Sequence, residues 1–188
     1  MKTPCSLGFL LAVTSLLNVS SGKAQNKTGG PSQFDAKLNS FKTSPSLFTG
    51  GTGTTQVRID YEAQSISYEL SYSGLSSPVT QAHIHFAQNG VNGNIIVYLC
   101  DNTGLAPKGT PACPDSGTVT GTVTAADVNP PNNPLPVTDQ GIQPGNFAAL
   151  IAAIEHNTGY VNVHTTIYPA GEIRGQLKRF GPDASGKQ

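Results

Sequence analysis

The sequence predicts a mainly β fold, an antiparallel β-sandwich or flattened barrel with one short amphipathic helix. Short runs in which apolar and polar residues alternate recur along the chain, and such alternation is typical of strands with one buried face. Glycine and proline, 21 and 14 of the 188 residues, separate these runs and supply the turns. Only the segment near 146–159 has an apolar stripe at helical spacing instead.

The strands can be placed in order from the alternation. Residues 57–61 and 66–72 both alternate and are joined by 63–65, which predicts a hairpin. The proline-rich segment 129–136 cannot join a sheet, because proline lacks the N–H donor, so a surface loop is expected there. Further strands are expected at 81–87, 94–100, 117–124, 160–165 and 171–180.

The predicted helix has a capping residue at each end. Asn146 can accept a hydrogen bond from the first turn, and Gly159 suits a left-handed residue after the last turn. The apolar stripe between them consists of Phe147, Leu150, Ile151 and Ile154.

The N-terminus has the pattern of a signal peptide. Lys2 precedes an apolar run at 5–19 that is too short to span a membrane comfortably, and small residues follow. We therefore expect a secreted or periplasmic protein with no stable membrane span after cleavage. Asn26 begins a glycosylation sequon, which matters only in a eukaryotic source. The expected layout is a signal peptide at 1–24, a polar linker at 25–33, one domain at 34–180 and a flexible tail at 181–188.

The charge distribution excludes several kinds of partner. Lys and Arg number 11, as do Asp and Glu, and no basic run is longer than Lys178-Arg179. A nucleic acid or an anionic membrane as partner would require a cationic stripe. The sequence also lacks a Gly-x-Ser-x-Gly elbow, a phosphate loop and a dinucleotide fingerprint. We expect a possible partner to be a small anion or an extracellular protein.

The cysteines indicate one disulfide. Cys5 falls in the predicted signal peptide, which leaves Cys100 and Cys113 in the exported chain. In an oxidising compartment these two thiols are expected to form a bond. The alternative is a metal site shared by cysteine and histidine. The absence of a close Cys-x-x-Cys pair in the sequence argues against it.

Three of the four histidines form a candidate metal site. His83 and His85 are two positions apart on a predicted strand, so their rings leave the same face. His164 ends a second strand whose valines take the core side. Neutral imidazoles suit zinc and copper. Histidines that only form hydrogen bonds across strands are the alternative. His156 lies in the last turn of the predicted helix, where the helix dipole favours a cation. We therefore do not include it among the metal ligands.

The last strand adds polar candidates. Ile173 is expected to face the core, so Glu172 and Arg174 share the other face. Glu172 can orient a ligand imidazole, or form an ion pair of little energetic weight. Arg174 can attract an anion and is the candidate catalytic residue. Asn162, on the face of His164, is a further candidate for supporting the ligands.

These motifs resemble the CHRD domain family, named from chordin. The matching segments are AHIHFAQNGVNGNIIVYL at 82–99, GNFAALIAAI at 145–154 and GYVNVHTTIYPAGEIRGQL at 159–177. The family hallmarks are His-x-His, Asn-x-His-Thr and Gly-Glu-Ile-Arg-Gly. The resemblance covers about 34–180 and implies an extracellular β-domain. In chordin such domains belong to a protein that binds growth factors.

A weaker likeness is to copper-zinc superoxide dismutases. These proteins also combine a His-x-His strand, a later histidine, a disulfide and an active-site arginine on an exported β-sandwich. The histidine spacings differ here, and no loop with a bridging histidine is apparent. The likeness therefore supports copper binding more than dismutation.

The leading hypothesis is an extracytoplasmic protein that holds one copper ion through His83, His85 and His164. Its chemistry, if enzymatic, would be copper-dependent oxidation or reduction of a small anion near Arg174. The competing hypothesis is a non-catalytic binding or matrix module without metal, with contacts made by loops such as 129–136. A glycan-binding jelly roll is a third, to which the absence of tryptophan is an objection.

Overall fold

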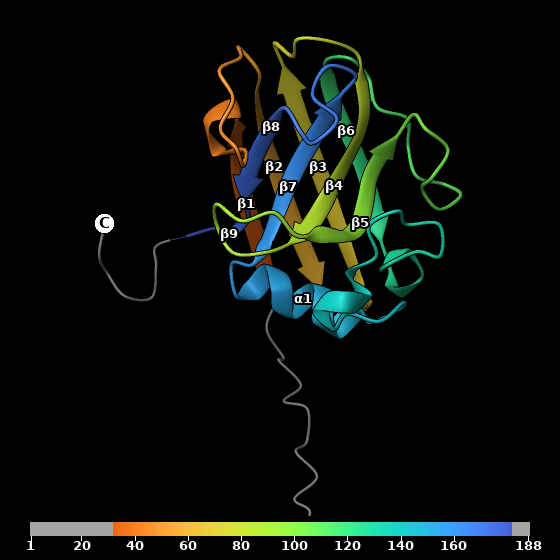
Figure 1. The fold of residues 1–188 in the computed structure, drawn as a ribbon. Helices are drawn as coiled ribbons and strands as arrows, with labels where there is room; N and C mark the ends of the chain where they lie inside the picture. Colours follow the sequence, from red (N-terminus) through yellow and green to blue (C-terminus); the bar gives the residue numbers. More distant parts are fainter. Residues whose placement is uncertain (1–31, 182–188) are drawn as a thin grey trace, which may run out of the picture.

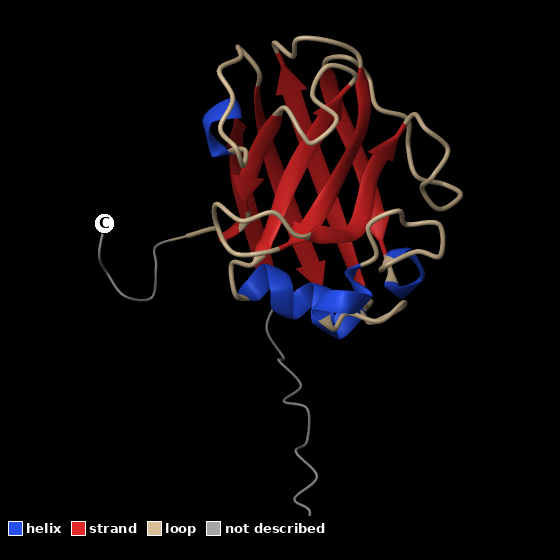
Figure 2. Cartoon of the chain, in the orientation of Figure 1, coloured by secondary structure: helices blue, strands red, loops and turns tan. Residues whose placement is uncertain are grey.

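The computed structural model describes residues 32–181, which contain nine strands, one α-helix and three 3-10 helices (Figure 2). The predicted signal peptide at 1–24, the sequon at Asn26, most of the predicted linker and the tail after residue 181 lie outside these residues. The strands are β1 (Ser32–Asn39), β2 (Thr52–Asp60), β3 (Ser65–Ser73), β4 (Val79–Phe86), β5 (Asn94–Asp101), β6 (Gly117–Val123), β7 (Gly159–Thr165), β8 (Ile173–Gln176) and β9 (Lys178–Arg179). The helices are η1 (Ser40–Lys42), η2 (Ala125–Asp127), η3 (Val137–Gln140) and α1 (Phe147–Glu155).

The strands form one antiparallel sheet that is nearly closed into a barrel. Their order is β5-β4-β7-β8-β1-β2-β3-β6, with β9 paired to β1. β8 and β1 share a single Cα pair, Asn39 with Arg174, so the sheet bends there. As a result β5-β4-β7-β8 lie in front of β1-β2-β3-β6 (Figure 1). The predicted fold class is confirmed.

The core lies between these two layers. Ile84, Val161 and Ile173 enter it from the front layer, and Val57 and Leu70 from the back, all of them fully buried. The alternation that predicted the strands is therefore the alternation that fills the core.

The helix α1 crosses one end of the barrel (Figure 1). Phe147, Leu150 and Ile154 are buried against the core. The Asn146 side chain caps the helix as predicted, because it accepts a hydrogen bond from the backbone N–H of Ala149. The predicted left-handed residue after the helix is not Gly159. Asn157 takes that conformation, with φ 57°, because asparagine tolerates it better than most residues.

Two strand predictions need correction. Strand β1 was not predicted, although Phe34, Ala36 and Leu38 alternate and are buried. The single strand expected at 171–180 is two strands, because β8 pairs with β7 and β9 pairs with β1. At the break, the backbone N–H of Leu177 donates to Gly159.

The proline-rich segment is a loop, as predicted, but it is anchored to the edge of β5. The backbone N–H of Asn129 donates to the carbonyl of Ile96 (2.7 Å), and the Asn133 side chain donates to that of Ile95 (2.8 Å). Both asparagines are buried. The loop therefore covers an edge that would otherwise present unpaired backbone groups.

The predicted disulfide is present. Cys100 in β5 is bonded to Cys113, which ties the edge strand to the segment that leads into β6. Within residues 32–181, no helix combines the length and the apolar character needed to cross a membrane.

Candidate metal centre

The three predicted ligands lie on the outward side of two neighbouring strands. In β4, Ala82 and Ile84 alternate with the histidines and belong to the core, so His83 and His85 leave the opposite face. In β7 the same alternation places His164 outward. β4 and β7 are antiparallel neighbours, with His85 opposite Tyr160 and His83 opposite Asn162. The pairing of strands distant in the sequence thus brings the rings together.

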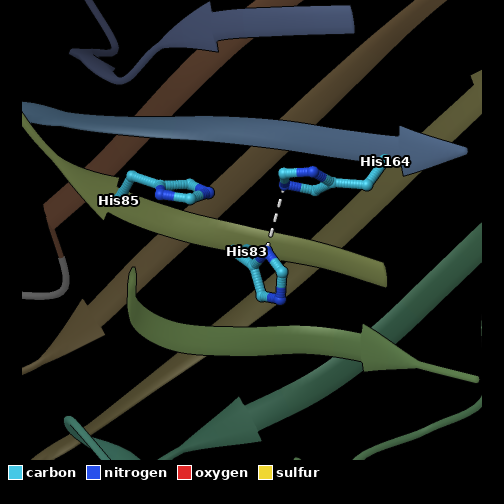
Figure 3. A group of neighbouring side chains, drawn as sticks. All are labelled: His83, His85 and His164. Atoms are coloured by element: carbon cyan, nitrogen blue, oxygen red, sulfur yellow. Dashed lines mark hydrogen bonds between the residues drawn. The ribbon is translucent and has the colours of Figure 1, made fainter. Parts of the chain in front are cut away.

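The rings converge, as the metal-site hypothesis required. One ring nitrogen from each histidine lies within 4.8 Å of the other two. The ring centroids of His83 and His164 are 4.9 Å apart, and those of His85 and His164 are 5.7 Å apart. Figure 3 shows the rings of His85 and His164 pointing toward each other from their two strands, with Nδ1 of His83 at 3.1 Å from Nε2 of His164.

The donor set fits a transition metal. Metal–nitrogen bonds of about 2.1 Å allow at most about 4.2 Å between two ligand nitrogens. The three ligand nitrogens lie within 4.8 Å of one another, which is slightly more than this maximum. A bound ion would therefore draw the rings together by a small rotation of the side chains.

The site is buried although it lies on the outer face of the sheet. The exposed fractions are 1% for His83, 3% for His85 and 8% for His164. Residues of two loops, 87–93 and 166–172, form hydrogen bonds to the rings. His164 is the ring that solvent reaches most easily.

The loop 87–93 orients His85. Nδ1 of His85 lies 3.0 Å from the carbonyl of Gly93, and the backbone N–H of Gly93 donates to the Tyr160 hydroxyl at 3.1 Å. A Cβ at Gly93 would lie 1.8 Å from the carbonyl oxygen of Phe86, so no side chain fits. The glycine lets the end of the loop pass close to the backbone of Phe86, and in this position its carbonyl meets the His85 ring.

The loop 166–172 orients His164. Nδ1 of His164 lies 2.9 Å from the carbonyl of Pro169. The Asn162 side chain donates to the neighbouring carbonyl of Ala170 at 3.1 Å. Asn162 therefore supports this ligand through the loop and not by direct contact with the ring.

These hydrogen bonds decide which nitrogens are free for a metal. A neutral histidine whose Nδ1–H donates to a carbonyl keeps a lone pair on Nε2. Nε2 of His85 is buried and has no hydrogen-bond partner among the described residues, and Nε2 of His164 accepts from Nδ1–H of His83. Nε2 of His83 is likewise unpaired within residues 32–181. Buried polar atoms without a partner are costly. An ion between the three rings would pair with Nε2 of His85. Nε2 of His83 points away from the other two rings (Figure 3), so His83 would bind such an ion through Nδ1, with its proton moved to Nε2.

All three imidazoles are held in the neutral form that binds metal. Burial, reinforced by the charges of His164 and His85, holds the pKa of His83 well below its ordinary value. Burial, together with the charge of His164, lowers the pKa of His85 to about 3. Burial also lowers the pKa of His164. The site is therefore ready to coordinate at neutral and mildly acidic pH.

The comparison with known families agrees with the sequence motifs. A family model described as the CHRD domain matches residues 34–177. The chain belongs to the CHRD family. The matched range includes the three histidines of the CHRD domain and both loops that orient them. None of the curated proteins compared with the chain matches it.

Two tyrosines of the CHRD domain complete the surroundings of the rings. Tyr160 stacks on His85 with centroids 4.9 Å apart and planes 8° apart. Tyr98, opposite His83 on β5, contacts the His83 ring edge-on at 4.5 Å. Its buried hydroxyl has no hydrogen-bond partner in the described part of the chain, and burial with the charge of Asp101 raises the pKa of Tyr98 to about 12. No pattern in the sequence distinguished Tyr98, because its neighbours in β5 from Ile95 to Cys100 are all apolar.

Arg174 lies beyond Tyr160, since β7 separates β8 from β4. Its guanidinium is 3.5 Å from the centre of the Tyr160 ring. The side chain is 1% exposed and donates to the carbonyl of Val91 (2.8 Å), the side chain of Asn92 (3.2 Å) and the carbonyl of Gln88 (3.3 Å). Arg174 thus holds the loop 87–93 in place. Attraction of an anion by Arg174 stays a prediction.

Glu172 does not contact an imidazole in the part of the chain that the structure describes. Its carboxylate accepts hydrogen bonds from the Ser76 hydroxyl (2.7 Å) and the Thr165 hydroxyl (2.9 Å). Thr165 follows His164 in β7, so its side chain leaves the other face of the strand. Glu172 lies in a bend before β8, which begins at Ile173, so the predicted alternation does not extend back to Glu172.

Proposed function

We propose that this CHRD protein acts outside the cytoplasm and binds a single copper ion through His83, His85 and His164. The observation that carries the proposal is the group of three buried, neutral imidazoles whose ligand nitrogens lie within 4.8 Å of one another. Such a group fixes the ligands before the ion arrives, so little ordering of side chains opposes binding.

Copper suits this donor set better than other divalent ions. Imidazole nitrogen is a ligand of intermediate softness, and Cu²⁺ binds nitrogen sites more tightly than Zn²⁺ or the earlier first-row metals. The disulfide Cys100–Cys113 and the family both accord with an oxidising, extracytoplasmic compartment. Export itself rests on the predicted signal peptide at 1–24.

The residues around the rings have distinct roles in this proposal. The carbonyls of Gly93 and Pro169 hold two rings in the tautomer that leaves Nε2 free. Bound copper would supply one-electron redox chemistry at a position left open by three protein ligands. A small anion would approach past His164, the most exposed ring. The positive charge of Arg174, which acts on His85 across Tyr160, would favour it.

A second function, a binding or matrix module without metal, is favoured by a specific observation. The nitrogens Nδ1 of all three histidines, and Nε2 of His164, already have hydrogen-bond partners within the protein. The cluster can therefore persist without an ion, as a polar network that joins β4 to β7. The two functions differ in metal content.

The test is metal analysis of the purified exported chain. Protein stripped with a chelator is dialysed against equal concentrations of Cu²⁺ and Zn²⁺, and bound metal is measured by mass spectrometry. We expect one copper per chain, and its loss in the variant His83→Gln/His85→Gln. The control His156→Gln changes an exposed histidine outside the site and should keep the metal. If the unaltered chain and the double variant both bind negligible copper, the proposal of a copper site is wrong. The binding or matrix module without metal is then the function that remains.

A further inference from the structure

A groove of about 570 Å³ runs along β1 and β9, and none of the three histidines lines it. Its walls come from these two strands, the end of η1, and the loops that contain Asn89 and Asn157. In Figure 1 these strands lie on the left, where the described chain ends. A volume of this size is within the range of small-molecule sites.

Positive charge is concentrated in the groove. Four cationic side chains line it against one carboxylate, that of Asp35, which gives a formal charge of +3. The chain as a whole has 11 Lys and Arg, 11 Asp and Glu and a net charge of zero, so this local excess is a property of the fold and not of the composition. The four cations are Lys37, Lys42, Lys178 and Arg179.

The backbone brings the cations together. Lys178 in β9 is paired with Asp35 in β1, and Lys37 follows two positions later on the same face. Lys42 ends η1, and its ammonium donates to the backbone carbonyl of Lys37. Strand pairing and this hydrogen bond therefore bring the three lysines to one groove.

Little within the described residues neutralises these charges. Among residues 32–181, no carboxylate lies within 4.0 Å of Lys37, Lys42 or Lys178, whereas Arg179 has Glu155 at 3.8 Å. Partial burial lowers the pKa of Lys42, and the charges of Lys178 and Lys37 lower it further. Like charges held close together oppose folding, and a bound anion would relieve the repulsion.

We propose that this groove binds a small ligand that carries a phosphate or sulfate group. Ammonium and guanidinium groups donate charge-assisted hydrogen bonds to such oxyanions. The side chains of Asn89, Asn157 and Gln176 add polar groups for the uncharged part of the ligand. The inference is independent of metal binding at the histidines, because it rests on different side chains.

The experiment measures binding of three soluble compounds, glucose 6-phosphate, glucose 6-sulfate and glucose. Titration calorimetry at constant ionic strength separates a specific site from general screening. We expect one or both esters to bind and glucose not to bind. Binding of one ester alone identifies the group that the groove prefers, and binding of neither overturns the proposal.

Two matched double variants locate the site. Lys42→Gln/Lys178→Gln removes two charges from the groove, and we expect the ester to bind at least about tenfold more weakly. Arg58→Gln/Lys108→Gln removes two exposed charges elsewhere and should leave binding unchanged. Equal weakening in both variants would show that only the overall charge matters, which overturns the proposal.

A readout in the unaltered protein does not depend on how the variants fold. Addition of the ester should shift backbone amide resonances of residues 35–42 and 176–181 in nuclear magnetic resonance spectra. Shifts confined to other parts of the chain would also contradict the groove as the site.

Discussion

Acid should destabilise the metal-free protein through its buried histidines. The pKa of His85 is about 3 in the folded chain and about 6.5 in an unfolded one. Between these values the unfolded chain binds one more proton, so the free energy of unfolding falls as the pH falls, by about 1.4 kcal/mol per pH unit for each such histidine. The full interval of 3.5 pH units corresponds to about 5 kcal/mol for His85 alone.

This loss is large compared with the stability of a domain, which is typically about 5–15 kcal/mol. The pKa values of His83 and His164 are lowered in the same direction, so the slopes add. The useful range is pH 6.5 to 4.5, because exposed carboxylates begin to titrate below it. Stability should be nearly independent of these histidines above pH 7.

Urea unfolding at several pH values, with a chelator present, measures the effect. The variant His85→Gln should have a slope smaller by about 1.4 kcal/mol per pH unit than that of the unaltered chain. If His85→Gln keeps the full slope, the ring of His85 is not held neutral by burial, and the reasoning about a preformed ligand set fails.

Three further predictions concern the parts that support the site. Reduction of the bond between Cys100 and Cys113 should lower the free energy of unfolding by about 3 kcal/mol, measured by urea unfolding with and without reductant. Gly93→Ala should weaken copper binding at least about tenfold, because the added Cβ forces the loop away from His85, whereas Gly50→Ala has room for a Cβ and should not. Arg174→Lys should raise amide hydrogen exchange throughout the loop 87–93, since one ammonium cannot replace the forked contacts of the guanidinium; unchanged exchange would mean that the loop is held by other groups.

Residue alternation was enough to predict most of the strands and the ligands. His83 and His85 could be assigned to one face because strand geometry repeats every two residues. His164 could be added because valines mark the core side of its strand. The proximity of the two strands did not follow from alternation; it was assumed in the metal-site hypothesis and is now given by the pairing of β4 with β7.

What the sequence could not predict depends on irregular backbone. Glu172 lies in a bend just before β8, where the alternation does not hold, and its carboxylate accepts from Ser76 and Thr165. The role of Arg174 depends on the path of the loop 87–93, which no local pattern specifies. Tyr98 lies in a strand buried on both sides, where no alternation distinguishes one face from the other.

The alternation in β4 and β7 has a consequence for how this fold can diversify. Residues such as Ile84 and Val161 build the barrel, whereas the histidines beside them face the covering loops and take no part in the interior packing. Chemistry and architecture are therefore assigned to alternating positions of the same strands. A chain with other side chains at the three outward positions can keep an intact barrel and acquire a different ligand, or none.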